Sequence, residues 1–173
     1  INEVLWVGTP DFSIKRLDLA LQIWSLVENK NSNWNLTVLG DSPSLQNAKD
    51  LAHKLNLSSV KFLGRQNPEN YYKRASMLMM TSTTESFGLV LIEAMHFGAI
   101  PIAFDSFPAA KDIIGSDNGL LIDAFNIKNY SNKILELINN YEMRQSLIIS
   151  NINKSKKYDI HFIVKKWIKL FNK

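Results

Sequence analysis

The chain has 173 residues, of which 46% are apolar and 21% are charged. This composition excludes a disordered or fibrous protein and fits one folded domain covering residues 1–173. No apolar run reaches the roughly 18–20 residues that span a membrane, and a chain without cysteine has no disulfide, thiolate metal site or cysteine nucleophile. We therefore expect a cytoplasmic protein.

The net charge of +4 is concentrated at the C-terminal end. Residues 1–150 carry 13 basic and 15 acidic side chains, a balance of −2, whereas residues 151–173 carry seven lysines and one aspartate, a balance of +6. A nucleic-acid-binding domain normally carries its basic residues on the folded body. This distribution argues against a nucleic-acid partner.

Strand-like and helix-like segments alternate along the chain. The predicted strands are 3–8, 34–40, 60–64, 77–80, 99–104 and 119–122. The predicted helices are 14–29, 44–55, 68–75 and 88–97, and two or three more close the chain, the last at about 159–171. This alternation predicts an α/β fold, a Rossmann-like parallel sheet of about six strands with helices on both faces.

Ligands of open parallel sheets bind beyond the carboxyl ends of the strands. Three of the predicted strands end in glycine, at Gly8, Gly40 and Gly64. Glycine lets a backbone approach a ligand closely, but it also serves ordinary turns. These glycines support a ligand site and a plain turn equally.

Two acids stand eight residues apart after the fourth predicted strand. Glu85 lies in the polar loop 81–86, and Glu93 lies inside the helix that follows. Glu85 could cap that helix or accept hydrogen bonds from sugar hydroxyls. Glu93 could be solvated or could hold a ribose diol.

We expect the helix behind Glu85 to begin near Phe87. The free N–H groups of its first residues would form a partial positive pole that suits a phosphate. Gly88 has no side chain to block the approach of that phosphate. The two acids would then flank a diphosphate rather than hold another anion.

The segment 84–95 resembles the signature of family 4 retaining glycosyltransferases, and the surrounding motifs agree in order and spacing. These motifs are Gly8 with Lys15, the strand 60–64 with Tyr71 and Tyr72, the step from Gly98 to Pro101, and the segments 112–114 and 119–122. The resemblance covers essentially the whole chain. It implies the C-terminal, nucleotide-sugar-binding half of a GT-B enzyme, with the acceptor-binding N-terminal domain absent from this chain.

The resemblance also implies roles for individual residues. Glu85 would bind hydroxyls of the donor sugar and Lys15 would neutralise phosphate charge, so these two are the candidate catalytic residues. Glu93 would hold the ribose. The backbone of residues 87–89 would hold the diphosphate, Arg65 and its neighbours would frame the nucleobase, and Gly8 would leave room at the sheet edge. The complete set of candidate donor-binding residues is Gly8, Thr9, Arg16, Gly64, Arg65, Phe87, Gly88, Leu89 and Glu93.

One position departs from the family pattern. The family usually has an arginine directly after the first glycine, where this chain has Thr9. A threonine hydroxyl does not replace a bidentate guanidinium. We expect either that Arg16 or the helix pole takes more of the charge, or that donor affinity is weaker.

The resemblance implies a UDP- or GDP-sugar donor and a glycan or lipid-linked acceptor in cell-surface polysaccharide assembly. The sequence has no Asp-x-Asp pair, so we expect neither a metal nor another cofactor. Two competing functions are a sugar-nucleotide epimerase of the same fold and a non-catalytic nucleotide-binding module. The spacing of Glu85, Glu93, Gly98 and Pro101 favours the transferase.

The last predicted helix has two faces. Ile160, Ile163, Val164, Trp167 and Phe171 form an apolar stripe, and the basic stripe consists of Lys165, Lys166, Lys169 and Lys173. The helix could pack on the domain with a solvated basic face. Alternatively, it could bring the protein to the inner face of a membrane with anionic lipids.

Overall fold

The computed structural model describes residues 2–115 and 120–172. Its centre is a parallel sheet whose six strands lie in the order β3-β2-β1-β4-β5-β6. The strands are β1 (Glu3–Val7), β2 (Asn35–Leu39), β3 (Val60–Phe62), β4 (Met77–Met80), β5 (Ile100–Phe104) and β6 (Leu120–Ile122). The predicted fold class and all six strands are confirmed, and Gly119, the predicted start of the last strand, lies outside the described residues.

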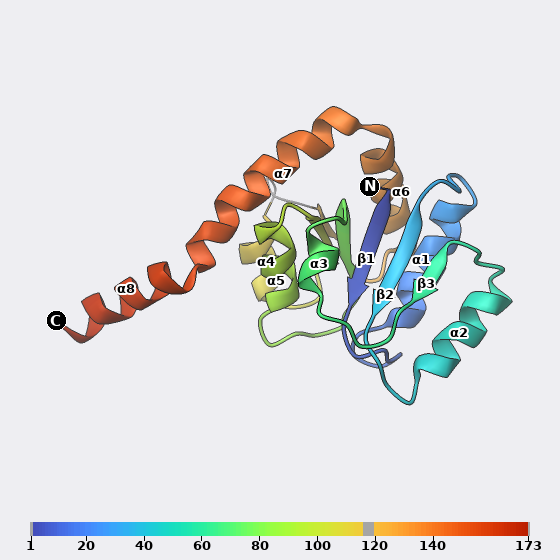
Figure 1. Cartoon of the computed structure of the whole chain (residues 1–173), viewed down its shortest axis with the longest axis horizontal. Coiled ribbons are helices and arrows are strands. Elements are labelled where there is room, and N and C mark those ends of the chain that lie inside the picture. Colours follow the sequence, from blue (N-terminus) through green and yellow to red (C-terminus); the bar gives the residue numbers. More distant parts are fainter. Residues whose placement is uncertain (1, 116–119, 173) are drawn as a thin grey trace.

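Helices cover both faces of this sheet (Figure 1). They are α1 (Leu17–Glu28), α2 (Leu45–Lys54), α3 (Glu69–Tyr72), α4 (Leu89–His96), α5 (Ala109–Ile113), α6 (Ile127–Asn139), α7 (Tyr141–Ser155), the short 3-10 turn η1 (Lys156–Tyr158) and α8 (Ile160–Phe171). The helix α5 was not predicted, because five residues are too few to show helical periodicity.

Two apolar clusters hold these layers together. Trp6 of β1 belongs to the cluster built with α1, α2 and α6, whereas the neighbouring Leu5 belongs to the cluster built with α3, α4 and α5. Alternate side chains of a strand point to opposite faces, so each central strand contributes to both clusters. This explains why these strands read as continuous apolar runs in the sequence.

The first helix begins three residues later than predicted, at Leu17. The carboxylate of Asp11 accepts hydrogen bonds from the N–H groups of Ser13, Ile14 and Lys15 and from the Ser13 hydroxyl. A side chain that captures nearby N–H groups offers the backbone an alternative to the helix. The segment between β1 and α1 is therefore an ordered loop that carries Lys15.

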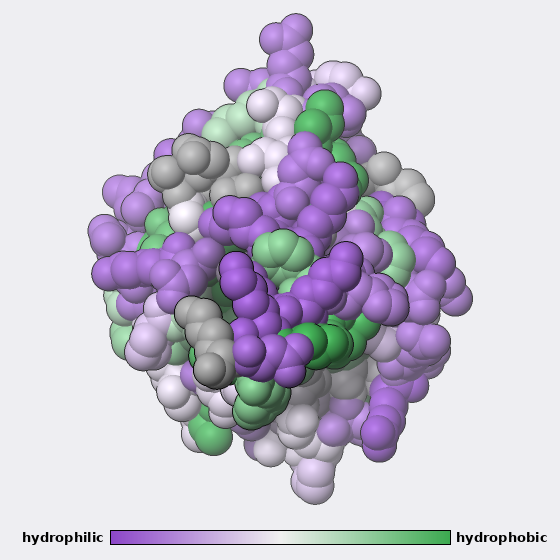
Figure 2. Space-filling view, turned by 90° about the vertical axis from the view of Figure 1, so that its left-hand side faces the viewer, coloured by the Kyte–Doolittle hydropathy of each residue, from purple (hydrophilic) through white to green (hydrophobic). Residues whose placement is uncertain are grey.

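The last helix, α8, projects away from the sheet and its covering helices (Figure 1). It contributes no buried residue, and its apolar side chains include six that are 43–66% exposed and Phe171, which is 77% exposed. The interpretation that it packs on this domain is wrong. Figure 2 views the molecule from the side on which α8 projects and shows hydrophobic patches among the hydrophilic surface. None of the helices within the described residues is both long and apolar enough to cross a membrane.

The carboxyl ends of β1, β2 and β3 are locked to one another through glycines. The Gly8 N–H donates to Leu39 O at 3.0 Å, and the Gly40 N–H donates to Gly64 O at 2.8 Å. Gly40 has φ +141°, and a Cβ placed there would lie 1.7 Å from Gly8 O. No side chain fits between these strand ends, so Gly40 is a steric requirement of the sheet edge.

We expect Gly40→Ala to destabilise the fold by about 3 kcal/mol or more, because the backbone must move to remove the clash. The matched control is Gly64→Ala, which has φ +67° but meets nothing within 4 Å and should cost only about 1–2 kcal/mol. Urea unfolding of the two variants measures the difference. Equal losses would contradict the proposed close contact.

We also expect a pH-dependent contribution from Asp11. Burial raises its pKa, but the hydrogen bonds from Ile14, Ser13 and Lys15 outweigh burial, so the pKa is lowered overall. A lowered folded-state pKa stabilises the fold above the unfolded value of about 3.9, and this stabilisation is lost as the pH falls through the folded value.

Asp11→Asn should therefore be less stable than the wild type at neutral pH. The difference in unfolding free energy should shrink below about pH 4. Denaturant unfolding between neutral and acidic pH measures it, with Asp123→Asn, at an exposed position, as the control. A constant difference across the whole range would show that the Asp11 charge does not stabilise this loop.

Candidate functional site

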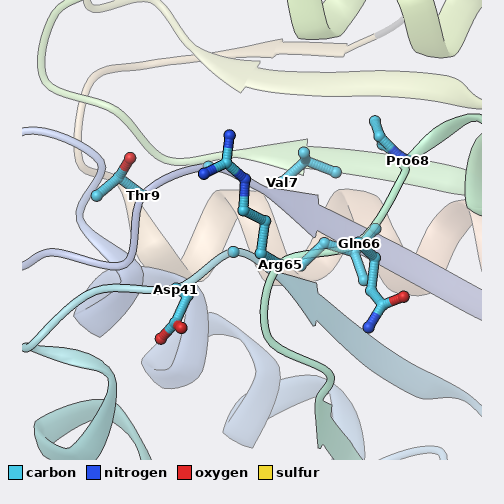
Figure 3. Close-up of a pocket in the computed structure, with 9 residues that line it drawn as sticks. Val7, Thr9, Asp41, Arg65, Gln66 and Pro68 are labelled. Carbon is cyan, nitrogen blue, oxygen red and sulfur yellow. The ribbon is translucent and has the colours of Figure 1, made fainter.

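A cavity of about 430 Å³ lies at the carboxyl ends of β1, β2 and β3. It is lined by Val7, Gly8, Thr9, Leu39, Gly40, Asp41, Arg65, Gln66 and Pro68 (Figure 3). Three of the predicted site residues, Gly8, Thr9 and Arg65, are in this lining. Gly64 precedes Arg65 and holds the turn through its carbonyl bond to Gly40.

The two candidate catalytic residues are in direct contact. Lys15 Nζ lies 2.6 Å from Glu85 Oε1, and the Ser82 hydroxyl donates to the same oxygen at 2.6 Å. The side chains of Lys15 and Glu85 are only 27% and 13% exposed. Residues 70 positions apart in the sequence thus meet because β1 and β4 are neighbours in the sheet.

The contact is supported by bonds between the loops that follow β1 and β4. The Thr81 hydroxyl donates to the carbonyls of Lys15 and Arg16, both at 2.9 Å, and accepts a bond from the Trp6 indole N–H at 3.2 Å. The Thr83 N–H donates to Ile14 O at 2.7 Å. These bonds fix the backbone on each side of the ion pair.

The interpretation that Glu85 caps α4 is wrong. Among the described residues no side chain caps α4, and its N-cap is Gly88 in the left-handed conformation at φ 91°. A Cβ at Gly88 would lie 3.2 Å from the Phe107 ring. The left-handed backbone and the Phe107 ring are therefore sufficient reasons for glycine at this position.

The predicted start of this helix, at residue 88 or near Phe87, is one or two residues too early. The helix begins at Leu89, so Phe87 lies outside it, where its side chain is 42% exposed and makes an edge contact with Tyr158. The N–H groups of Leu89 and of the residue after it lie in the first turn, where no carbonyl of a preceding turn can accept their hydrogen bonds. The helix pole expected from the sequence therefore starts at Leu89.

Glu93 lies on the exposed side of α4, and its carboxylate accepts a hydrogen bond from Tyr72 at 2.9 Å. Burial, followed by the charge of Glu93 and the bond to it, raises the pKa of Tyr72. Sequence patterns do not single out Tyr72 as a partner of Glu93, because the two are 21 residues apart and meet only when α3 packs beside α4.

The cations near the site differ in their partners. Arg16 donates from Nε and Nη2 to both oxygens of Asp18, at 2.9 and 2.8 Å, and these bonds raise its pKa. Arg16 is outside the cavity lining, which gives no support to the expectation that it replaces the arginine missing at Thr9.

Arg65 is the cation among the described residues that line the cavity. It is exposed, and within the described parts of the chain its guanidinium makes neither an ion pair nor a hydrogen bond. In Figure 3 its guanidinium extends in the direction of Thr9 and Val7, whereas the Asp41 carboxylate points the other way. The Arg65 guanidinium is therefore a cation without a partner in the described chain, and it points toward the end of β1, which Thr9 follows.

Comparison with known proteins identifies relatives over most of the chain. A glycosyltransferase of Haemophilus influenzae, described as uncharacterized, is 34% identical over 90% of this chain and 45% of its own length. A Campylobacter jejuni alpha-1,4-N-acetyl-D-galactosaminyltransferase, named for an undecaprenol-linked substrate, is 28% identical over 98% of this chain and 47% of its own length. The chain spans about half or less of the length of these relatives.

Among solved structures, a complex of a mutant of the Staphylococcus aureus protein TarM superposes with a TM-score of 0.90 at 27% identity. It covers 99% of this chain and 36% of the TarM chain, and that crystal contained fondaparinux, alpha-GlcNAc-glycerol and UDP. The α/β fold thus matches that of GT-B glycosyltransferase domains. Residues 2–154 match the family described as "Glycosyl transferases group 1", and the chain belongs to that family.

Proposed function

We propose that the chain is the C-terminal, donor-binding half of a retaining family 4 glycosyltransferase, which moves a hexose-type sugar from UDP or GDP to a glycan or lipid-linked acceptor. The observation that carries this proposal is the Lys15–Glu85 contact. The Lys15 side chain lies next to Gly8 of the cavity lining, and Glu85 precedes the first residue of α4, Leu89, by four positions. The Campylobacter jejuni relative is named for an undecaprenol-linked substrate, and the TarM mutant was crystallised with UDP. We infer a role in cell-surface polysaccharide assembly from them.

Each part of the donor would meet groups of matching chemistry. The turn at Gly64–Gln66 would frame the nucleobase, and Glu93 would hold the ribose diol. Lys15, the amides of α4 and the free guanidinium of Arg65 would bind the diphosphate. Glu85 would accept hydrogen bonds from the sugar hydroxyls in exchange for its bond to Lys15.

The proposed chemistry is stabilisation of the leaving group. When the anomeric C–O bond breaks, the electron pair stays on the diphosphate oxygen, and positive charge develops on the sugar. Lys15 and the preorganised amides of α4 stabilise the new negative charge. The acceptor hydroxyl attacks on the face that the diphosphate leaves and gives its proton to a phosphate oxygen, so the configuration is retained. We propose that this requires no metal.

We propose that acceptor binding needs surfaces beyond these 173 residues, because the relatives are about twice as long or longer. The isolated chain should then bind nucleotide weakly and transfer no sugar. Robust transfer by the chain alone would contradict this part of the proposal. Release of a rearranged sugar would favour an epimerase, and binding of a base without any preference for phosphates would favour a non-catalytic module.

The nucleotide preference of the chain tests the donor site directly. We expect UDP or GDP to bind more tightly than the corresponding monophosphate and nucleoside. Arg65→Ala should weaken diphosphate binding about tenfold because it removes a charge-assisted bond, and it should leave nucleoside binding unchanged. Isothermal titration calorimetry measures both, and Lys49→Ala, at an exposed position on α2, is the control.

A loss of affinity for nucleoside and diphosphate alike in Arg65→Ala would assign Arg65 to the base instead. Equal affinity for all three ligands in the wild type would contradict the whole donor-site proposal.

We also propose that α8 associates with the inner face of an anionic membrane. Its apolar stripe covers nothing in the described chain, and lysines occupy the opposite face. Each lysine near such a surface contributes about 1 kcal/mol. The chain should therefore sediment with phosphatidylglycerol vesicles at low salt and dissociate as salt rises, but not sediment with phosphatidylcholine vesicles.

Replacing Trp167 with aspartate on the apolar stripe should abolish this binding, whereas Asn172→Asp adds the same charge outside that stripe and should reduce it only slightly. If the wild-type chain ignores anionic vesicles at low salt, the lipid proposal is wrong. The apolar stripe would then belong to a protein contact.

A further inference from the structure

The carboxylate of Glu93 is held at one oxygen only. Its Oε2 accepts the bond from the Tyr72 hydroxyl, at 2.9 Å. In the parts of the chain that the structure describes, Glu93 has no other side-chain hydrogen bond and no ion pair, although it is exposed on α4. One oxygen is thus fixed by the protein and the other is available to a ligand.

The donor of this bond is itself rigidly placed. Tyr72 is 2% exposed, and its ring stacks on Phe97 with 6.2 Å between centroids and 14° between planes. Its environment raises the pKa of Tyr72, so the hydroxyl keeps its proton at physiological pH and remains a donor. By contrast, the neighbouring Tyr71 is only half-buried, and Arg74 lies over its ring at 4.5 Å.

The same short helix links Tyr72 to the cavity. Pro68, at the start of α3, lines the cavity beside Arg65 and Gln66. Tyr72 is the last residue of α3 and reaches α4. The turn proposed to frame the nucleobase and the acid proposed to hold the ribose are therefore connected through four residues of helix.

We propose that Tyr72 is a positioning residue, which orients Glu93 toward the ribose hydroxyls of a bound nucleoside diphosphate. This rests on the proposed function of Glu93. A flexible glutamate on an exposed helix face loses side-chain entropy when it grips a diol. A fixed hydroxyl donor reduces that loss, because one oxygen is already placed before the ligand arrives.

The purely structural alternative is that the bond only satisfies a buried hydroxyl. The two roles differ in what they do to ribose discrimination. Loss of a positioning residue weakens the binding of a ribonucleotide more than the binding of a 2′-deoxyribonucleotide, because the deoxyribonucleotide has one hydroxyl fewer for Glu93 to hold. A purely structural residue changes the stability of the domain, but as long as the domain stays folded it leaves the preference for the ribonucleotide over the deoxyribonucleotide unchanged.

The experiment compares UDP with 2′-deoxy-UDP, and GDP with 2′-deoxy-GDP, by calorimetry on the 173-residue chain. The wild type should prefer the ribonucleotide about tenfold or more, because the deoxy ligand lacks one hydroxyl bonded to a carboxylate. Tyr72→Phe should lower this preference about fivefold, and Glu93→Ala should abolish it. Adding Tyr72→Phe to Glu93→Ala should change the preference no further.

Tyr71→Phe is the matched control, and it should leave the preference at the wild-type value. Thermal unfolding of each variant shows whether it is folded at the temperature of the titration. If Tyr72→Phe weakens both ligands by the same factor, or changes neither, the positioning role is wrong while the donor site stands. If the wild type binds UDP and GDP without any ribose preference, both the role of Glu93 and that of Tyr72 are wrong. If it binds neither diphosphate, the proposed function itself fails.

Discussion

The contact between Lys15 and Glu85 is the interaction on which the candidate site depends. It joins the loop after β1 to the loop after β4, and it forms only because these strands are neighbours in the sheet. Partial burial strengthens the attraction relative to an exposed pair. The bonds of Thr81 and Thr83 to the opposite loop fix the two backbones around it. The Glu85 carboxylate and the Lys15 ammonium group are thus held in contact near the edge of the sheet where the cavity lies.

This pairing determines how a donor would enter. A diphosphate and a hydroxyl-bearing sugar offer Lys15 an anion and Glu85 donors, so each side chain would exchange its partner for a ligand group of equivalent chemistry. The exchange costs little because neither group is left without a partner. Arg65 and Glu93 differ, since in the described chain Arg65 is uncommitted and Glu93 is bonded at one oxygen. These two can bind a ligand without first losing an ion pair.

The fold was predictable because strand and helix periodicities are local properties of the sequence. The alternation placed six strands correctly, and the position of Glu85 after the fourth strand indicated the edge of the sheet at which the cavity lies. Local patterns did not predict how individual side chains pair. Arg16 is bound by Asp18 two residues away, whereas the sequence suggested that Arg16 could take over phosphate charge. The bond between Tyr72 and Glu93 depends on how α3 packs beside α4, and no spacing encodes it.

Errors at element ends have specific physical causes. Asp11 delays α1 by capturing N–H groups, and Gly88 delays α4 by adopting a left-handed conformation. The sequence predicts that α8 is an amphipathic helix, and the structure has a helix there. An amphipathic pattern shows only that the apolar face of a helix needs a partner. It does not say which partner, and the described part of this domain does not supply it.

The most direct test of the site is a crystal structure of the chain with UDP or GDP bound. We predict that the diphosphate lies between Lys15 Nζ and the first amides of α4 and contacts the Arg65 guanidinium. We also predict that the Lys15–Glu85 distance has increased and that the base lies in the turn at Gly64–Gln66. A nucleotide bound away from the carboxyl ends of the strands, or bound with the Lys15–Glu85 pair intact and no contact to α4, would contradict these predictions.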